Sequence, residues 1–233
     1  MLAEELLLLA LDDERGTVHS SASIGLDYGL AGALLLELTL EGRLGIEDNA
    51  LVATGADSGD ALLDDTLALV RAKPGKKVAY WVTKLPGRLK PLRGRLLQRL
   101  VARGTLKKHE RRILLIFHQT VHPERDGRVE HDIRQRLDAV LLHGAEADTR
   151  TRALAQLAAA SRVSDALYGR AERKRLKQRL DEFERSPLGD GVTQAVMQAE
   201  QAAVMVAIMA ASVAATSAAT SAACSAASSS CST

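Results

Sequence analysis

A cluster of cationic side chains is the part of this sequence best suited to chemistry. Residues 84–100, KLPGRLKPLRGRLLQRL, hold six cations, two prolines and no acid. Lys90 and Arg93 lie three residues apart, on either side of a proline that would open a helix. A helix N-terminus offers free N–H groups and a partial positive charge, which suits a phosphate. We therefore predict phosphate binding by Lys90 and Arg93, with Arg88 and Arg95 adding positive charge.

The sequence contains no complete motif for catalysis or metal binding. His118 and His122 have a helical metal spacing, but they flank an expected strand end and a proline. The segment 72–77, AKPGKK, lacks the upstream glycine and the following Ser or Thr of a phosphate loop. Cys224 and Cys231 lie in a Ser/Ala-rich tail and form no metal or disulfide framework. We expect no catalytic residue, no cofactor and no metal, in a reducing, cytoplasmic setting.

The charges are segregated along the chain, although the formal net charge is only +2. Residues 1–70 hold 14 acids and two bases, residues 71–112 hold 15 bases and one acid, and the rest is balanced. Such asymmetry indicates an acidic partner for the basic block, such as nucleic acid or an anionic membrane surface. The other interpretation is that the acidic and basic blocks pack against each other.

The composition favours a mainly helical fold with short hairpins. Aromatic residues make up only 3% of the chain, so Leu, Ala and Val must build the core. A short hairpin is predicted around the polar turn of residues 43–55, and 72–77 is read as a linker. The predicted helices are 2–11, 26–40, 60–70, 92–103, 129–144, 149–169, 170–187 and a last one from 192 onward.

Two segments repeat with a constant offset of 62 residues. In 33–44 and 95–106 the same pattern of leucines ends on Gly42 and Gly104, which suit the left-handed position after a helix. A pair of extended segments, expected to form a hairpin, follows each glycine. In the second copy the turn of this hairpin is expected near 108–110. Helix, glycine stop and hairpin is the pattern of a winged-helix unit, so we predict two such units followed by a helical half.

The predicted organisation is one domain with an attached tail. Residues 1–200 form the domain, with the helix–hairpin repeats in 1–122 and the helical half in 123–200. Residues 201–233 are expected to form an Ala/Ser-rich helix and a partly disordered tail. The apolar stretch in that segment is short of the ~20 residues that span a membrane. The N-terminus lacks the basic region of a signal peptide.

The basic block is compatible with lipid or with DNA. Anionic lipids attract each cation by about 1 kcal/mol. In a winged helix, the helix 92–103 would instead present Arg and Gln side chains to DNA bases. The apolar strand that follows must be buried, paired with another subunit or laid against lipid. If it pairs with another subunit, it forms a self-association hairpin whose contacts are Leu114, Leu115, Ile116 and Phe117.

The collinear order of several motifs resembles the Golgi phosphoprotein 3 family. These motifs are EELLLLALDDERG, YGLAGALLLELTLEGRL, LLDDTLALV, RLLQRLVARGTL with ILLIF and HP, and DIRQRLDAVLL, which together cover roughly residues 1–185. The resemblance implies a mainly α-helical fold with short hairpins, one of which serves self-association. Eukaryotic members of the family are peripheral membrane proteins that bind phosphatidylinositol 4-phosphate and hold Golgi glycosyltransferases through their tails.

The resemblance also implies a head-group pocket, which this sequence matches in part. The family's pocket uses a Trp, an Arg on the glycine-rich helix and two Arg three residues apart. The spaced pair falls on Lys90 and Arg93, the helix Arg falls on Ala31, and the Trp would lie in 19–24, where there is none. The chain's one Trp, Trp81, lies elsewhere.

We therefore expect a non-enzymatic protein, peripheral on the inner face of the membrane. It would bind phosphatidylinositol 4-phosphate-like or other anionic phospholipid head groups through the basic block. The expected partners are the membrane surface, further copies of the chain and membrane-protein tails. The alternative is a winged-helix nucleic-acid-binding protein.

Overall fold

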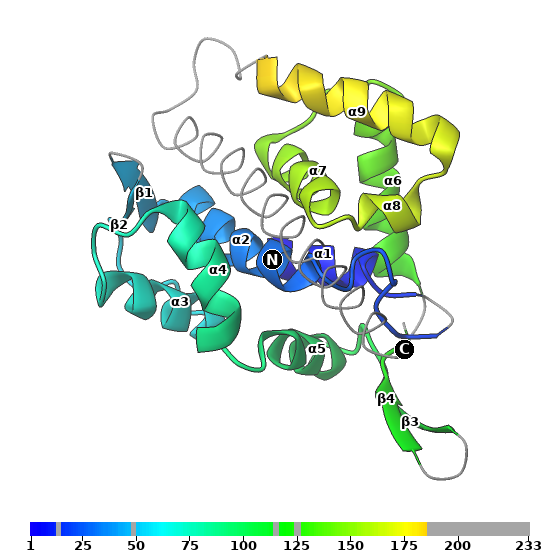
Figure 1. Ribbon diagram of the computed structural model, residues 1–233, viewed down its shortest axis with the longest axis horizontal. Helices are drawn as coiled ribbons and strands as arrows, with labels where there is room; N and C mark the ends of the chain where they lie inside the picture. The colour runs from blue at the N-terminus through cyan, green and yellow to red at the C-terminus, as the bar shows by residue number, and fades with distance from the viewer. Residues whose placement is uncertain (13–14, 48–49, 114–116, 124–126, 186–233) are drawn as a thin grey trace, which may run out of the picture.

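The computed structural model describes residues 1–12, 15–47, 50–113, 117–123 and 127–185, and for 110–113, 117–120 and 184–185 it describes the backbone only. Within these ranges the protein is mainly helical, with nine helices and two antiparallel hairpins (Figure 1). The elements are α1 (Leu2–Leu9), α2 (Leu26–Leu40), β1 (Leu44–Glu47), β2 (Ala50–Ala53), α3 (Ala61–Arg71), α4 (Val78–Arg88), α5 (Leu92–Ala102), β3 (His109–Ile113), β4 (Phe117–Val121), α6 (Arg128–Leu141), α7 (Thr149–Ala160), α8 (Ser164–Leu167) and α9 (Arg170–Arg185).

Helix α2 forms the centre of the fold. Twelve of its 15 residues are buried, because leucine, alanine and glycine occupy all of its sides. It packs against α1, α3, α4, α5 and α7, so it joins the first half of the chain to the second. The core is built mainly from Leu, Ala and Val, as the low aromatic content predicts.

The internal repeat is confirmed at the two helix ends. Gly42 after α2 and Gly104 after α5 both have positive φ, 68° and 76°. The amide of Arg43 donates to the carbonyl of Leu38 over 2.7 Å, and the equivalent bond after Gly104 measures 2.9 Å. This is the Schellman arrangement, which satisfies carbonyls at a helix end and turns the chain toward the hairpin.

The second hairpin lies further along the chain than the sequence predicts. His109 pairs with Val121 and Ile113 with Phe117, so the predicted turn at 108–110 is wrong. That polar segment has none of the Gly, Pro or Asn residues that favour tight turns, and the amide of Lys107 already donates to the carbonyl of Pro123. The hairpin projects away from the helices (Figure 1).

The proposed self-association residues fall around the end of this hairpin. Leu114, Leu115 and Ile116 lie outside the described residues, and Phe117 is the first residue of β4. The predicted helix from 192 onward and the predicted tail 201–233 also lie outside the described residues.

Helix α4 was missed by the sequence analysis, which assigned no element between the linker and residue 92. Its buried residues Val78, Trp81, Val82 and Leu85 have the spacing i, i+3, i+4, i+7, which is the signal that indicates such a helix. Pro86 in its last turn obscures the pattern, because proline usually ends a helix. Trp81 therefore lies in the core rather than in a ligand pocket.

The predicted helix 149–169 is interrupted. Helices α7 and α8 are separated at Arg162, which has a φ of 61°. Ser161 packs tightly against α2, because a Cβ added to Gly29 would lie 2.8 Å from the Cβ of Ser161. The break therefore lets the α7–α8 turn fit closely against the start of α2.

The second half of the chain packs against the first through α1. Ile133, Leu137, Val140 and Leu141 of α6 are buried, and α6 and α7 both contact α1. No helix among the described residues has the length and apolar character needed to cross a membrane.

Candidate functional site

The corner between α4 and α5 is fixed by two buried leucines. Leu89 ends α4 and Leu92 begins α5, and each is only 4% exposed. Lys90 lies between them and is exposed, as is Arg88 in the last turn of α4. The local sequence therefore anchors the backbone through leucine and directs the cations to solvent.

Arg93 lies in the first turn of α5 and contacts the start of α2. Its Nε donates to Asp27 Oδ1 over 2.5 Å, and its Nη2 donates to the carbonyl oxygen of Ser23 over 2.9 Å. The structure thus brings the α5 start against residues 19–24, where the resemblance places one wall of a pocket. It also pairs Arg93 with an acid from the first third of the chain.

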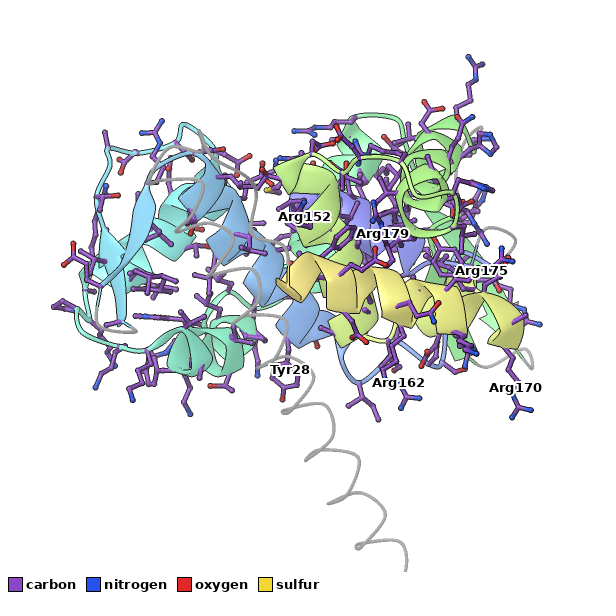
Figure 2. All side chains as sticks on the ribbon, turned by 90° about the horizontal axis from the view of Figure 1, so that it is seen from above. Tyr28, Arg152, Arg162, Arg170, Arg175 and Arg179 are labelled. Carbon is purple, nitrogen blue, oxygen red and sulfur yellow. The ribbon has the colours of Figure 1, made fainter. Side chains whose placement is uncertain are left out.

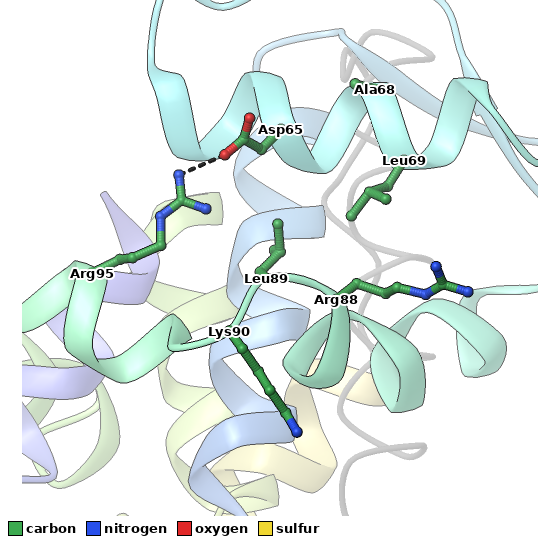
Figure 3. Close-up of a pocket in the computed structure, with 7 residues that line it drawn as sticks. All are labelled: Asp65, Ala68, Leu69, Arg88, Leu89, Lys90 and Arg95. Atoms are coloured by element: carbon green, nitrogen blue, oxygen red, sulfur yellow. Dashed lines mark hydrogen bonds and ion pairs between the residues drawn. The ribbon is translucent and has the colours of Figure 1, made fainter.

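Arg95 faces the opposite direction, toward α3. Its Nη2 donates to Asp65 over 2.6 Å, at the edge of a surface hollow of about 360 Å³. Figure 3 shows this pair on one side of the hollow and the ammonium group of Lys90 pointing away from it. The four predicted residues therefore do not converge on one pocket. The hollow is lined by Asp65, Ala68, Leu69, Arg88, Leu89, Lys90 and Arg95.

Three cations at this corner remain available to a ligand. Lys84, Arg88 and Lys90 are exposed and have no ion pair or hydrogen bond with another residue in the described ranges. Arg93 and Arg95, by contrast, are partly exposed at 29% and 31% of their side chains and each holds a carboxylate. The free positive charge therefore comes from the α4 end and from Lys90.

The remaining arginines of α5 are held by acids. Arg99 donates to both carboxylate oxygens of Asp60, over 2.7 and 2.6 Å, and to Glu4 over 3.1 Å. Arg103 donates to Glu4 over 2.9 Å. The hydrogen bond from Arg99 lowers the pKa of Asp60 below its ordinary value. Much of the charge segregation in the sequence is therefore neutralised by ion pairs within the molecule, and the arginines of the α5 face proposed for base reading are paired with acids of α1 and of the start of α3.

Buried carboxylates were not found by the sequence analysis. Glu4 and Glu37 are 3% and 7% exposed, although each lies in a run of leucines. Glu37 accepts from the amide of Leu2 over 2.6 Å and from Arg150 over 2.8 Å, so it joins α1, α2 and α7. An acid on the apolar side of a helix is the signal that indicates a buried cationic partner.

The structure also places two other residues that the sequence analysis considered, one from the implied pocket and one from the histidine pair. Ala31, which stands where the family has an Arg, is completely buried in α2. His122, one of the two spaced histidines, has a lowered pKa because it is partly buried and lies near Lys108. Within the described ranges no group of three or more His, Cys, Asp or Glu residues is placed to hold a metal ion.

Comparison with known proteins adds a family match to this geometry. The profile of the family described as Golgi phosphoprotein 3 (GPP34) matches residues 2–203. Vacuolar protein sorting-associated protein 74 of Eremothecium gossypii is 30% identical over 163 residues, covering 60% of this chain and 49% of that protein. Its counterpart in Schizosaccharomyces pombe is 28% identical over 162 residues, covering 60% and 48%. The chain thus spans about half the length of the curated relatives it matches.

Proposed function

The chain belongs to the Golgi phosphoprotein 3 family, and we propose that it is a non-enzymatic peripheral membrane protein that binds anionic phospholipid head groups. The site is the α4–α5 corner, and the ligand group is the phosphate of a phosphatidylinositol 4-phosphate-like or other anionic head group. The observation that carries the proposal is the exposed, unpaired Lys90 beside Arg93, at the two positions that match the family's spaced pair. The relatives are named for vacuolar protein sorting, which supports a membrane role.

Electrostatics supports reversible binding at this corner. A phosphate beside Lys90 meets the free cation first and then competes with Asp27 for the guanidinium of Arg93. Each cation near an anionic surface adds about 1 kcal/mol of attraction, which salt screens within a Debye length of ~8 Å. Because Lys84 and Arg88 also lie nearby, we expect binding of the protein to anionic membranes to weaken as the salt concentration rises.

Vesicle co-sedimentation tests the site. We expect Lys90→Ala with Arg93→Ala to weaken binding to phosphatidylglycerol- or phosphoinositide-containing vesicles about 25-fold, since two cations are lost. The matched control is Lys73→Ala with Lys77→Ala. It removes two exposed cations that lie just before the first residue of α4, at the end of the helix opposite the proposed site. Equal binding by the wild type and the site variant would exclude this site.

Self-association through the β3–β4 hairpin is the second part of the proposal. The hairpin projects from the helices (Figure 1). In the sequence, the end of β3 and the start of β4 are joined by an apolar run that includes Leu114, Leu115, Ile116 and Phe117. Such a strand end is a ready surface for a second copy of the chain. Sedimentation analysis of Leu115→Asp tests this, because an unchanged oligomeric state would exclude hairpin pairing.

The cellular setting follows from these two parts as a proposal. The chain would lie on the inner, cytoplasmic face of a membrane and hold membrane-protein tails there. Co-sedimentation of such tails with protein-coated vesicles, compared with bare vesicles, tests the tail-binding role.

A further inference from the structure

Helix α9 carries a stripe of cations that the proposed site does not use. Arg170, Arg173, Lys174 and Lys177 have the spacing i, i+3, i+4, i+7, so they lie along one side of the helix. The side chains of Leu176 and Phe183 are buried, which fixes the inward side of α9. The stripe is exposed.

The charges of α9 are placed against the helix dipole. Its first two turns hold five cations and one acid, Glu172, where the helix has a partial positive charge, and the acids Asp181 and Glu182 follow toward its negative end. The reverse order would stabilise the helix. Helix stability therefore does not explain why these cations lie where they do.

Most of the stripe has no partner within the molecule. Arg173 donates to the carbonyl oxygens of Tyr168 and Asp165, over 3.1 and 2.8 Å, and so holds the start of α9 in place. Arg170, Lys174 and Lys177 make no ion pair or hydrogen bond to any other residue that the structure describes. Their charges are therefore open to an external anion.

A further cation, Arg162, lies between the start of α2 and the stripe (Figure 2). Figure 2 shows Tyr28, Arg162 and Arg170 along one edge of the molecule, while Arg152 and Arg179 lie on the other side of α9. Arg162 follows Ser161, whose carbonyl oxygen would lie 2.9 Å from a Cβ added to Gly25. Its left-handed backbone is uncommon for a residue other than glycine. Its side chain is 63% exposed and donates to Asp165 over 2.9 Å, so an external anion would share it with that carboxylate.

The same segment of α2 also meets the proposed site. Arg93 of α5 contacts Ser23 and Asp27, while the α7–α8 turn contacts Gly25 and Gly29. The α4–α5 corner and the α7–α8 turn thus flank one short segment. Cations from two distant parts of the sequence are thereby placed around the start of α2.

We propose that Arg170, Lys174 and Lys177, together with Arg162, form a second contact surface for the anionic membrane that Lys90 meets. The inference rests on the proposed function and extends its membrane-facing surface. A membrane is an extended sheet of negative charge, so it can contact cations on several elements at once. Nucleic acid is disfavoured because the α5 arginines that could read bases are already bound to acids.

Two charge reversals on α9 provide a matched test. Lys177 and Arg175 are both exposed and unpartnered among the described residues, and two positions along a helix rotate the side chain by about 200°. We expect Lys177→Glu to weaken binding to phosphatidylglycerol-containing vesicles about 25-fold, since it changes the charge by two, and Arg175→Glu to weaken it far less. Lys174→Ala with Lys177→Ala should match Lys177→Glu. Circular dichroism checks that each variant is folded.

The outcomes separate this inference from the function on which it rests. If the wild type ignores anionic vesicles, the proposed function fails. A second outcome is that the wild type binds, the double variant Lys90→Ala with Arg93→Ala binds more weakly, and Lys177→Glu binds like the wild type. In that case the proposed function stands and only the α9 surface is refuted. If Lys177→Glu and Arg175→Glu lose vesicle binding equally, the membrane attracts the net charge of α9 and not one face of the helix. That result would also overturn the inference. A loss of duplex DNA binding without a loss of vesicle binding would assign the stripe to nucleic acid instead.

Discussion

Arg93 at the start of α5 donates a 2.5 Å hydrogen bond to Asp27 at the start of α2. A cation assigned to phosphate binding is thus held by a carboxylate of the same chain. Both side chains are partly exposed, at 29% and 45%, so a phosphate can reach the pair and compete for it. In the proposed site, Asp27 would therefore compete with a bound phosphate for Arg93.

Asp27→Asn is predicted to strengthen binding to anionic vesicles about five-fold, because it releases one cation from its internal partner. Co-sedimentation at fixed ionic strength measures the change. Asp65→Asn is the control, since it releases Arg95 on the α3 side of the corner with the same change in net charge. If the two variants gain equally, Asp27 has no special position in the site.

Glu4→Gln is predicted to lower the free energy of unfolding by about 1–3 kcal/mol. Glu4 is buried and accepts hydrogen bonds from Arg99 and Arg103, so the amide would leave both arginines with a poorer partner. Urea denaturation measures the loss. Glu41→Gln should change stability little, because burial and the charge of Glu37 raise the pKa of Glu41 and already disfavour its ionised form. A stable Glu4→Gln variant would show that the ion pairs are unimportant.

Gly29→Ala is predicted to destabilise the protein by about 1–3 kcal/mol, although alanine is the better helix former. Its Cβ would lie 2.8 Å from the Cβ of Ser161, so the α7–α8 turn would have to shift. A Cβ added to Gly87 in α4 would meet nothing within 4 Å, so Gly87→Ala should instead stabilise by about 0.5–1 kcal/mol. Thermal unfolding distinguishes the two signs, and a gain in Gly29→Ala would contradict the tight contact.

Stability is predicted to fall at alkaline pH because of Tyr168. Burial and the hydrogen bond to Asp138 raise the pKa of its hydroxyl above the ordinary value of 10. Above pH 10 the unfolded chain loses this proton while the folded chain keeps it, so the free energy of unfolding falls as pH rises. Tyr168→Phe should be less stable at neutral pH and show a shallower alkaline decline. Urea midpoints from pH 8 to 11 would measure both, and parallel pH profiles would refute this role.

Local patterns were enough to predict much of the fold. The helix 26–40 begins and ends as predicted, because a glycine precedes its apolar run and another follows it. The repeated glycine stops were also predictable, since Gly42 and Gly104 occupy a backbone conformation that few other residues adopt. Helix α4 was missed because its proline outweighed a regular apolar spacing.

The site was only partly predictable. The sequence places Lys90 and Arg93 three residues apart, and the short backbone between them keeps the two residues close together. It did not show that Arg93 turns to Asp27 while Arg95 turns to Asp65, because those acids come from helices distant in sequence. The distinction between free and paired cations required all of these helices to be placed.

The sequence by itself determined the ends of helices such as α2 that a glycine follows, where charge concentrates along the chain and that leucine builds the core. These properties depend on residues a few positions apart, so local sterics and periodicity define them. Only the tertiary structure decided which charges cancel and which face solvent. Ion pairing depends on distances of a few ångströms between residues such as Arg99 and Glu4, which are 95 positions apart.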